Sequence, residues 1–448
     1  MKNINKLLND LIQYCYKKNN FELSIDDRPL YNLLGEIKKH LTYKKYFEVD
    51  IVISTIENFV ESIKYSSKKV DNELVTKLID LINKNLEINV EDHYIVIPVP
   101  KAKCSMLLKF DKYAIIPQDF TREEKIKEIS KLVGVVYEEI ESFAEHTEKS
   151  RSPSFYEYTL LCIKVNNQTS MVKFDAENIS KYTIFTIRCL YYAYMVNKNN
   201  KLSFWSLIRD SKPKYPSTHI AIFSKESWRM GHHPINFFSN CNFNLDWLEE
   251  SEYQKVMVDL IDTIINPENS DELSERFFNA LLLMNKSYQL SNQSEELLSV
   301  LVSLSTAESL LTKGKNEKRL RLSAIIPRIV SREGYTIPQL SKIINQLYMK
   351  RNDFLHGGEN IVQFYGNESD SKDRDTLILL QQLISKVICS YPTYTNYISG
   401  MLAKEGREIG NNNYQERSNR WDQIINDMFN KIITGEDNII FEKINEVN

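Results

Sequence analysis

Arg351, Asn352 and His356 form the part of the sequence whose residue types and spacing favour chemistry. They lie in the octapeptide 351–358, Arg-Asn-Asp-Phe-Leu-His-Gly-Gly. Cleavage of RNA by its own 2′-hydroxyl needs a proton donor or acceptor near pH 7 and a cation beside the phosphorane oxygens. Histidine titrates near neutral pH, whereas arginine stays charged and can bind phosphate through two parallel hydrogen bonds. The octapeptide therefore favours phosphodiester chemistry that requires no metal.

The residues before the octapeptide predict the helix that carries it. Apolar side chains recur with helical spacing at Ile337, Leu340, Ile344 and Leu347. The next position of this stripe is 351, where the spacing predicts an apolar core residue but the sequence has arginine. We therefore expect a helix over 337–356 that places a cation at the edge of the core.

Helix geometry then decides which groups of the motif share a face. Tyr348, Asn352 and His356 follow one another at four-residue spacing, so they lie on one face, and Tyr348 could stack on a base or simply pack. At about 100° per residue, Arg351 lies about 140° from His356 and about 60° from Tyr348. The following glycines, Gly357-Gly358, are typical of a helix C-cap and predict that His356 lies in the last turn.

The motif and the helix before it resemble the signature of the HEPN superfamily, most closely its ApeA-like branch of bacterial antiphage proteins. The resembling residues are Tyr348-Met-Lys-Arg351-Asn352-Asp-Phe-Leu-His356-Gly-Gly. That family carries an arginine and a histidine separated by four to six residues, and this chain has the four-residue spacing with asparagine after the arginine. The resemblance implies a helical bundle that pairs with a second copy, so that two motifs form one composite site.

The resemblance also implies an activity. Many HEPN proteins are metal-independent endoribonucleases of toxins and abortive-infection systems, which predicts an RNA substrate, no cofactor and a homodimer formed through the bundle. Arg351, His356 and Asn352 are then the expected catalytic residues, supported by Tyr348 and Glu308. Other HEPN members bind RNA or a nucleotide without cutting it, or act as adaptors, and this alternative stays open.

The resemblance covers roughly residues 271–397. Within it the apolar pattern predicts four helices and, after a loop, a fifth. Their expected ranges are 271–290, 293–312, 318–332, 337–356 and 373–391.

Each candidate residue also has a purely structural interpretation. His356 beside two glycines is often only a helix cap. Arg351 can form a buried ion pair with a carboxylate such as Glu308 on the neighbouring helix, and such a pair can also orient the guanidinium for catalysis. The basic residues Lys318, Arg319 and Arg321 can bind an RNA backbone, although such a run is more often a solvated face.

Composition limits the remaining possibilities. The 448 residues include 57 basic and 60 acidic side chains, for a net charge of −3, so attraction of RNA must be local. No apolar stretch reaches 18 residues and the first residues do not resemble a secretion signal, so we expect a cytoplasmic protein that does not engage a membrane. The six cysteines are scattered, which predicts buried free thiols and neither a zinc site nor a disulfide framework.

The sequence divides into four regions. Residues 1–90 read as amphipathic helices, and residues 91–250 as an α+β domain with strands near 94–99, 105–110, 112–116, 156–165 and 218–223. Two long helices, over 121–148 and 176–197, interrupt these strands. Residues 251–400 correspond to the HEPN bundle, and residues 401–448 to a C-terminal helical extension.

Two features of the middle region have weaker functional interpretations. His219, His232 and His233 could suggest metal ligands, but no acidic or cysteine partner has the spacing of a metal site. An aromatic group could recognise a ligand but more often fills a core. Its members are Phe204, Trp205, Trp228, Phe237, Phe238, Phe243 and Trp247.

The sequence therefore predicts a mostly α protein with an α+β middle domain and a C-terminal HEPN bundle of four to five helices. We expect a cytoplasmic, homodimeric endoribonuclease that acts in antiphage defence by cleaving RNA. The regions before the bundle are expected to sense a phage-derived or cellular trigger or to restrain the nuclease.

Overall fold

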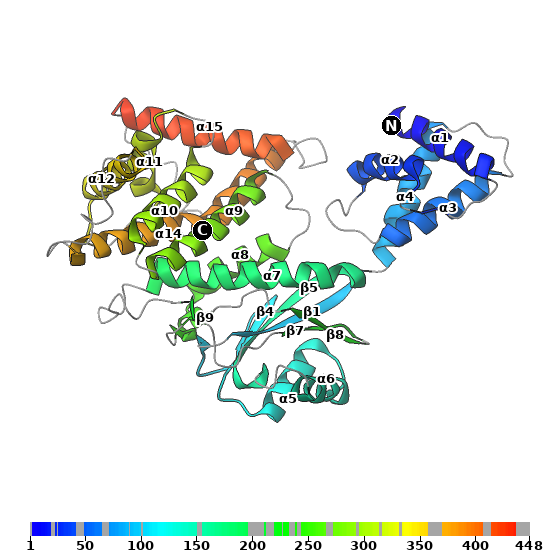
Figure 1. The fold of residues 1–448 in the computed structure, drawn as a ribbon, viewed down its shortest axis with the longest axis horizontal. Helices are drawn as coiled ribbons and strands as arrows, with labels where there is room; N and C mark the ends of the chain where they lie inside the picture. The colour runs from blue at the N-terminus through cyan, green and yellow to red at the C-terminus, as the bar shows by residue number, and fades with distance from the viewer. Residues whose placement is uncertain are drawn as a thin grey trace.

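The computed structural model of the chain is mostly helical, with one six-stranded antiparallel sheet in the middle region (Figure 1). Within the residues that it describes, no helix combines the length and the apolar character needed to cross a membrane. The described residues are 2–18, 23–24, 26–41, 49–64, 71–88, 90–99, 102–149, 155–195, 210–211, 219–225, 227–232, 238–239, 243–265, 272–292, 295–312, 316–330, 334–356, 370–405 and 414–435.

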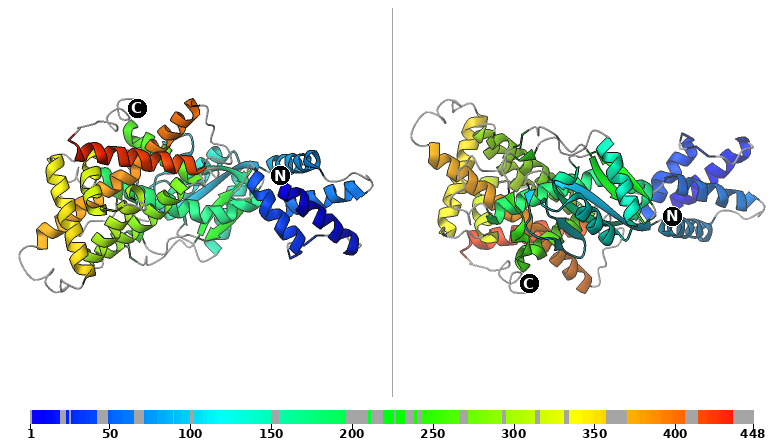
Figure 2. Two further views of the ribbon diagram at one scale, coloured as in Figure 1. Left: turned by 90° about the horizontal axis from the view of Figure 1, so that it is seen from above. Right: turned by 90° about the horizontal axis from the view of Figure 1, so that it is seen from below.

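Four helices form an N-terminal unit with its own core. They are α1 (Lys2–Lys18), α2 (Arg28–Ile37), α3 (Val49–Lys64) and α4 (Asn72–Ile88). Their apolar faces pack on one another in a cluster that draws its buried residues from this unit alone. Figure 2 shows the unit at one end of the molecule. The described residues between 2 and 88 are therefore mostly helical, as the apolar pattern of this region indicates.

The sheet of the middle region is antiparallel throughout. Its strand order is β3-β4-β5-β1-β7-β8, and β1 and β5 pair along their whole length, from Val90 opposite Gln168 to Val99 opposite Thr159. The strands are β1 (Val90–Val99), β3 (Leu108–Lys109), β4 (Tyr113–Ile116), β5 (Thr159–Gln168), β7 (His219–Phe223) and β8 (Trp228–His232). The α+β character predicted for this region is confirmed.

Helices cover both faces of this sheet. On β1, Ile95 and Ile97 belong to the core shared with α7 (Thr169–Leu190), whereas Val96 belongs to the core under α5 (Arg122–Val133) and α6 (Tyr137–Lys149). Since successive side chains of a strand point to opposite faces, a strand that is buried on both faces must be apolar at nearly every position. This explains why β4 and β7 are continuous apolar runs rather than alternating ones.

The prediction of one helix over 121–148 is wrong. Two helices, α5 and α6, occupy this stretch, and Gly134 separates them. Its φ of 70° lies in the left-handed region that glycine adopts at little cost, and this conformation ends α5 after Val133. The second long helix, α7, begins at Thr169 and passes into a π-helical turn over Tyr191–Met195.

The C-terminal region is a helical bundle whose core is continuous with the α7 face of the sheet. Four of the five predicted helices match within about three residues at each end, but the last one extends well past 391, through Pro392, and α8 was not predicted. The helices are α8 (Ser251–Ile265), α9 (Glu272–Asn292), α10 (Glu296–Leu311), α11 (Lys318–Ile329), α12 (Ile337–Leu355), α14 (Asp370–Lys404) and α15 (Tyr414–Ile433).

A buried polar cluster fixes α10 against α9 and α14. Ser287 Oγ on α9 lies 2.9 Å from Ser299 Oγ and 2.6 Å from Ser303 Oγ, both on α10. Gln381 on α14 donates to Ser287 Oγ at 3.0 Å. Because hydrogen bonds inside a core require one particular register, this cluster specifies how far α10 is displaced along its neighbours.

Lys125 ties α5 to the end of the strand layer. Its side chain is fully buried, and Nζ donates to the carbonyl oxygens of Gln118, Tyr156 and Tyr158. Burial lowers the pKa of Lys125 to about 8, so the ammonium still carries its proton at neutral pH and uses all three N–H donors.

We predict that Lys125→Met lowers the free energy of unfolding by about 3 kcal/mol or more, because it leaves three buried carbonyls without a donor. Urea denaturation of the full chain measures this loss. Lys127→Met, on an exposed position of the same helix, is the matched control and should change the free energy by less than about 0.5 kcal/mol. Equal effects of the two substitutions would contradict this role of Lys125.

Candidate functional site

The motif helix α12 begins with a capping box and buries one face. The Thr336 side chain accepts from the Gln339 backbone N–H, and the Gln339 side chain accepts from the Thr336 N–H. The buried residues are Leu340, Ile344, Leu347 and Tyr348, which pack against α10 and α11. Ile337, expected at the start of the stripe, is exposed instead.

Arg351, Tyr348, Lys318 and Glu308 come together in one set of contacts, which we call the Glu308 cluster. The Tyr348 hydroxyl donates to Glu308 Oε1 at 2.6 Å, and Arg351 Nη1 lies 3.2 Å from the same oxygen. Lys318 Nζ lies 3.2 Å from the other oxygen, Oε2. One carboxylate on α10 therefore joins side chains from α11 and α12, and the ion pair considered from the sequence is present.

The Glu308–Arg351 pair of this cluster is largely withdrawn from solvent, whereas Lys318 is 44% exposed. The side chains of Glu308 and Arg351 are 12% and 16% exposed, so water screens their attraction less than it would at the surface. The guanidinium also lies 4.8 Å from the centre of the Tyr348 ring. Because one carboxylate faces two cations, the cluster carries a net positive charge. It also holds the guanidinium in a fixed orientation beside a partly open edge.

Tyr348 acts in this cluster as a neutral donor. Burial and the hydrogen bond to Glu308 raise its pKa to about 12, although the nearby Arg351 opposes this shift. The phenol therefore keeps its proton across the physiological range. Its hydrogen bond leaves the Glu308 charge available to Arg351 and Lys318.

His356 lies apart from Arg351 on the same helix. It is the C-cap residue of α12; its backbone N–H donates to the Asn352 carbonyl at 3.0 Å, and its side chain is exposed. Asn352 is half-buried on the same face, whereas Arg351 points toward α10. Arg351 is therefore turned into the bundle, whereas the His356 side chain is exposed to solvent. The predicted capping glycines at 357–358 lie outside the described residues.

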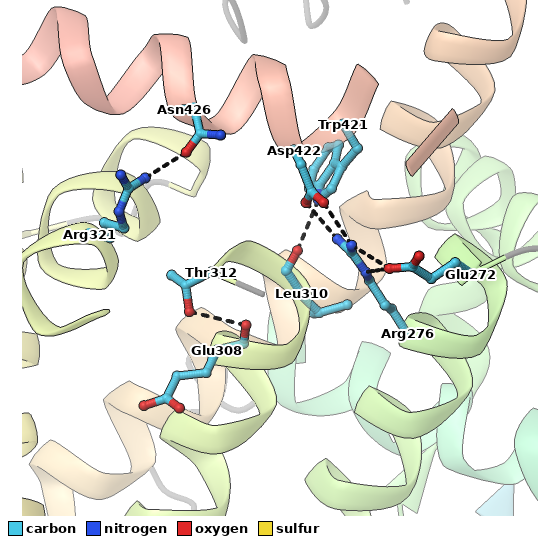
Figure 3. A network of polar contacts seen from close by, with 9 residues as sticks. All are labelled: Glu272, Arg276, Glu308, Leu310, Thr312, Arg321, Trp421, Asp422 and Asn426. Carbon is cyan, nitrogen blue, oxygen red and sulfur yellow. Dashed lines mark hydrogen bonds and ion pairs between the residues drawn. The ribbon is translucent and has the colours of Figure 1, made fainter. Parts of the chain in front are cut away.

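Of the three basic residues assigned to an RNA track, two contact different partners and the third is exposed. Lys318 belongs to the Glu308 cluster. Arg321 donates to Asn426 Oδ1 at 2.8 Å and lies 4.2 Å from the centre of the Phe429 ring, so it faces α15 (Figure 3). Arg319 is exposed. The structure thus separates the three, and of them only Lys318 adjoins Arg351.

Helix α15 holds the end of α10 that carries Glu308. Trp421 Nε1 donates to the Leu310 carbonyl at 2.9 Å, and Asp422 accepts from both terminal nitrogens of Arg276, at 2.7 and 2.9 Å (Figure 3). Arg276 also pairs with Glu272. This contribution was not predicted from the sequence, because residues 276 and 422 are far apart along the chain. The one sequence signal for it is Trp421, a large aromatic side chain in α15.

The middle region does not gather its histidines or aromatics into a site among the described residues. His219 and His232 are opposite each other on β7 and β8, and His233 lies outside the described residues. The described part of the chain contains no group of three or more histidine, cysteine, aspartate or glutamate side chains placed to hold a metal ion.

Two of the aromatic residues occupy different cores. Trp228 packs edge-on against Phe143 in the core under α5 and α6, with ring centres 5.4 Å apart. Trp247 belongs to the core on the α7 face, where its Nε1 donates to the Asn244 carbonyl. The side chains of the other five lie outside the described residues. The two tryptophans therefore fill cores rather than form one surface.

Five of the six cysteines, at positions 15, 104, 162, 189 and 389, are buried free thiols as predicted, and Cys241 lies outside the described residues. Burial raises the pKa of the Cys162 thiol to about 12, which makes it a poor nucleophile.

Comparisons with protein-family models, with curated proteins and with solved structures find no match to this chain. The function is therefore inferred from the residues themselves and from the resemblance of the motif.

We predict that Glu308→Ala lowers the free energy of unfolding by about 2–4 kcal/mol, because it leaves the Tyr348 hydroxyl and the Arg351 guanidinium without their acceptor. Urea denaturation measures the change. Glu275→Ala, an exposed glutamate on α9, serves as the control and should stay within about 0.5 kcal/mol of the parent. A Glu308 variant as stable as the control would mean that the cluster has no structural role.

Proposed function

We propose that the chain is a metal-independent endoribonuclease of the HEPN type that acts in antiphage defence. The observation that carries the proposal is the arrangement around α12: a guanidinium oriented by Glu308 and Tyr348, and an exposed imidazole at the end of the same helix. The helical bundle around them is consistent with the resemblance of the motif. The defence role rests on that resemblance alone.

Each side chain then has a role in the proposed reaction. Arg351 stabilises the charge that develops on the phosphorane oxygens, assisted by Lys318, and its fixed orientation lowers the cost of reorganisation. His356 transfers the proton between the 2′-hydroxyl and the leaving 5′-oxygen. Asn352 holds the imidazole or a phosphate oxygen. Glu308 and Tyr348 position the guanidinium and take no part in proton transfer.

The divergence of Arg351 and His356 supports a site shared by two copies of the chain. Ideal helix geometry separates positions 351 and 356 by about 140°. Within one chain Arg351 is turned toward Glu308, whereas the His356 side chain is exposed. Exposed apolar side chains accompany His356 on α12: Met349 is 46% and Leu355 is 53% exposed. Such residues favour a protein contact. We therefore propose that two α12 ends face each other across a two-fold axis.

A binding protein without nuclease activity is the second candidate. The Arg351 side chain is only 16% exposed and forms an ion pair with Glu308. A buried ion pair of this kind can have a purely structural role. An RNA-binding or adaptor protein would use the same cationic side chains without chemistry. RNA cleavage and RNA binding assays distinguish the nuclease from the binding protein.

We predict that purified protein cleaves labelled RNA in the presence of a metal chelator, and that cleavage fails when the nucleotide before the scissile bond is 2′-deoxy. Arg351→Ala and His356→Ala should each lower the cleavage rate at least about 100-fold, because each removes one role in the transition state. Gel-resolved cleavage measures the rates, and circular dichroism verifies folding.

The matched controls are Arg28→Ala and His40→Ala, which change the same residue types in the N-terminal unit and should leave cleavage unchanged. Cleavage that survives both motif substitutions would exclude this site. RNA binding without cleavage by the parent protein would favour the second candidate.

We also predict complementation between inactive variants. In a mixed dimer of Arg351→Ala and His356→Ala chains, one intact arginine and one intact histidine remain on different chains. Refolding the two variants together should therefore restore measurable cleavage, whereas either variant alone stays inactive. If the mixture stays as inactive as its components, the two residues do not act across an interface.

A further inference from the structure

A cavity of about 550 Å³ lies where the middle region meets the bundle. Its walls are α8, α14 and the π-helical turn after α7; the lining includes Tyr194, Lys255, Asp259, Thr393 and Tyr394. This volume falls within the range of small-molecule sites, roughly 300–1,000 Å³. The cavity does not include any residue of the Glu308 cluster.

Two irregular helical segments border this cavity. The turn Tyr191–Met195 is π-helical, and Pro392 lies inside α14 between the lining residues Ser390 and Thr393. The π turn packs against α14. π-helical turns are rare and are frequently found at functional sites, and an internal proline removes a backbone hydrogen bond and is costly in a helix. Their meeting at one cavity therefore favours a binding role.

The α8 wall is polarised along its length. Ser251, Lys255 and Asp259 follow at four-residue spacing, so they lie along one face and span about 12 Å. The N-terminal end offers a helix terminus, a hydroxyl and an ammonium, which favour an anion. Glu252 lines the same end and limits its positive charge. This balance suits one phosphate better than two or three.

The other end of the wall offers a carboxylate. Asp259 is half-buried, and Thr393 Oγ1 lies 3.5 Å from its Oδ2. Burial and the nearby Asp262 raise the pKa of Asp259, while Lys255 and Thr393 oppose the shift. A half-buried carboxylate is stabilised most by a partner with two parallel N–H donors, because such a partner replaces the hydrogen bonds to water that burial removed.

We propose that this cavity binds a guanosine monophosphate, with the guanine edge on Asp259 and the phosphate at the Ser251 and Lys255 end. Among the four RNA bases, only guanine presents two adjacent N–H donors, from N1 and the 2-amino group, to one carboxylate. Tyr194 and Tyr394 add aromatic side chains to the lining, which favours a planar base. This site is independent of the proposed nuclease function.

Isothermal titration calorimetry of the full chain with guanosine monophosphate tests the proposal. We expect binding that is at least about tenfold weaker for inosine monophosphate, which lacks the 2-amino group, and for adenosine monophosphate, because a charge-assisted hydrogen bond is lost. Guanosine without its phosphate should also bind more weakly. Asp259→Asn should weaken binding of guanosine monophosphate at least about tenfold, since the amide replaces one acceptor with a donor.

The matched control is Asp262→Asn, one turn further along α8. Asp262 pairs with Lys112 at 2.6 Å and is not among the lining residues, so this variant should bind as the parent does. Absence of binding at millimolar guanosine monophosphate would overturn the proposal, as would equal affinity for all three nucleotides. Loss of binding in Arg351→Ala but not in Asp259→Asn would place the nucleotide at the Glu308 cluster and would also overturn it.

Discussion

The carboxylate of Glu308 is the constraint on which the candidate site depends. Arg351 occupies the position on α12 where the apolar stripe would place a core side chain, so its charge must be balanced within the bundle. Glu308 provides that balance, and it engages Tyr348 and Lys318 as well. The single, largely buried carboxylate of Glu308 thereby fixes the relative positions of α10, α11 and α12. It also fixes the direction of the guanidinium.

The surrounding bundle keeps that carboxylate in place. The serine and glutamine cluster sets the register of α10 against α9 and α14. Trp421 on α15 holds the C-terminal end of α10, and the Arg276–Asp422 pair joins α9 to α15. These contacts are polar and directional, so they require one arrangement of the helices where apolar packing alone would tolerate several. The precision of the site therefore derives from parts of the chain remote in sequence from the motif.

The middle region and the bundle share one hydrophobic core. Helix α7 covers one face of the sheet and also packs against α8, α9 and α14 (Figure 1). A change in the packing of α7 would therefore affect both the sheet and the bundle. The cavity beside the π turn lies at this junction, where an occupant would contact segments from both regions.

The sequence by itself determined the helical class, the presence of strands in the middle region and the position of the motif helix, because these follow from local periodicity and capping residues such as Thr336. It also anticipated the Arg351–Glu308 pair, because the two helices were expected to be neighbours in the bundle. It did not separate α5 from α6 at Gly134, and it extended the basic track across Lys318, Arg319 and Arg321.

Only the tertiary structure decided which side chains meet. Lys318 joins Glu308 while Arg321 turns to Asn426, and Asp422 pairs with Arg276 across 146 positions of sequence. Local patterns are short in range, whereas these contacts depend on how whole helices pack. For the same reason the cavity between α8 and α14 has no signature in the sequence, since its walls approach one another only in the folded chain.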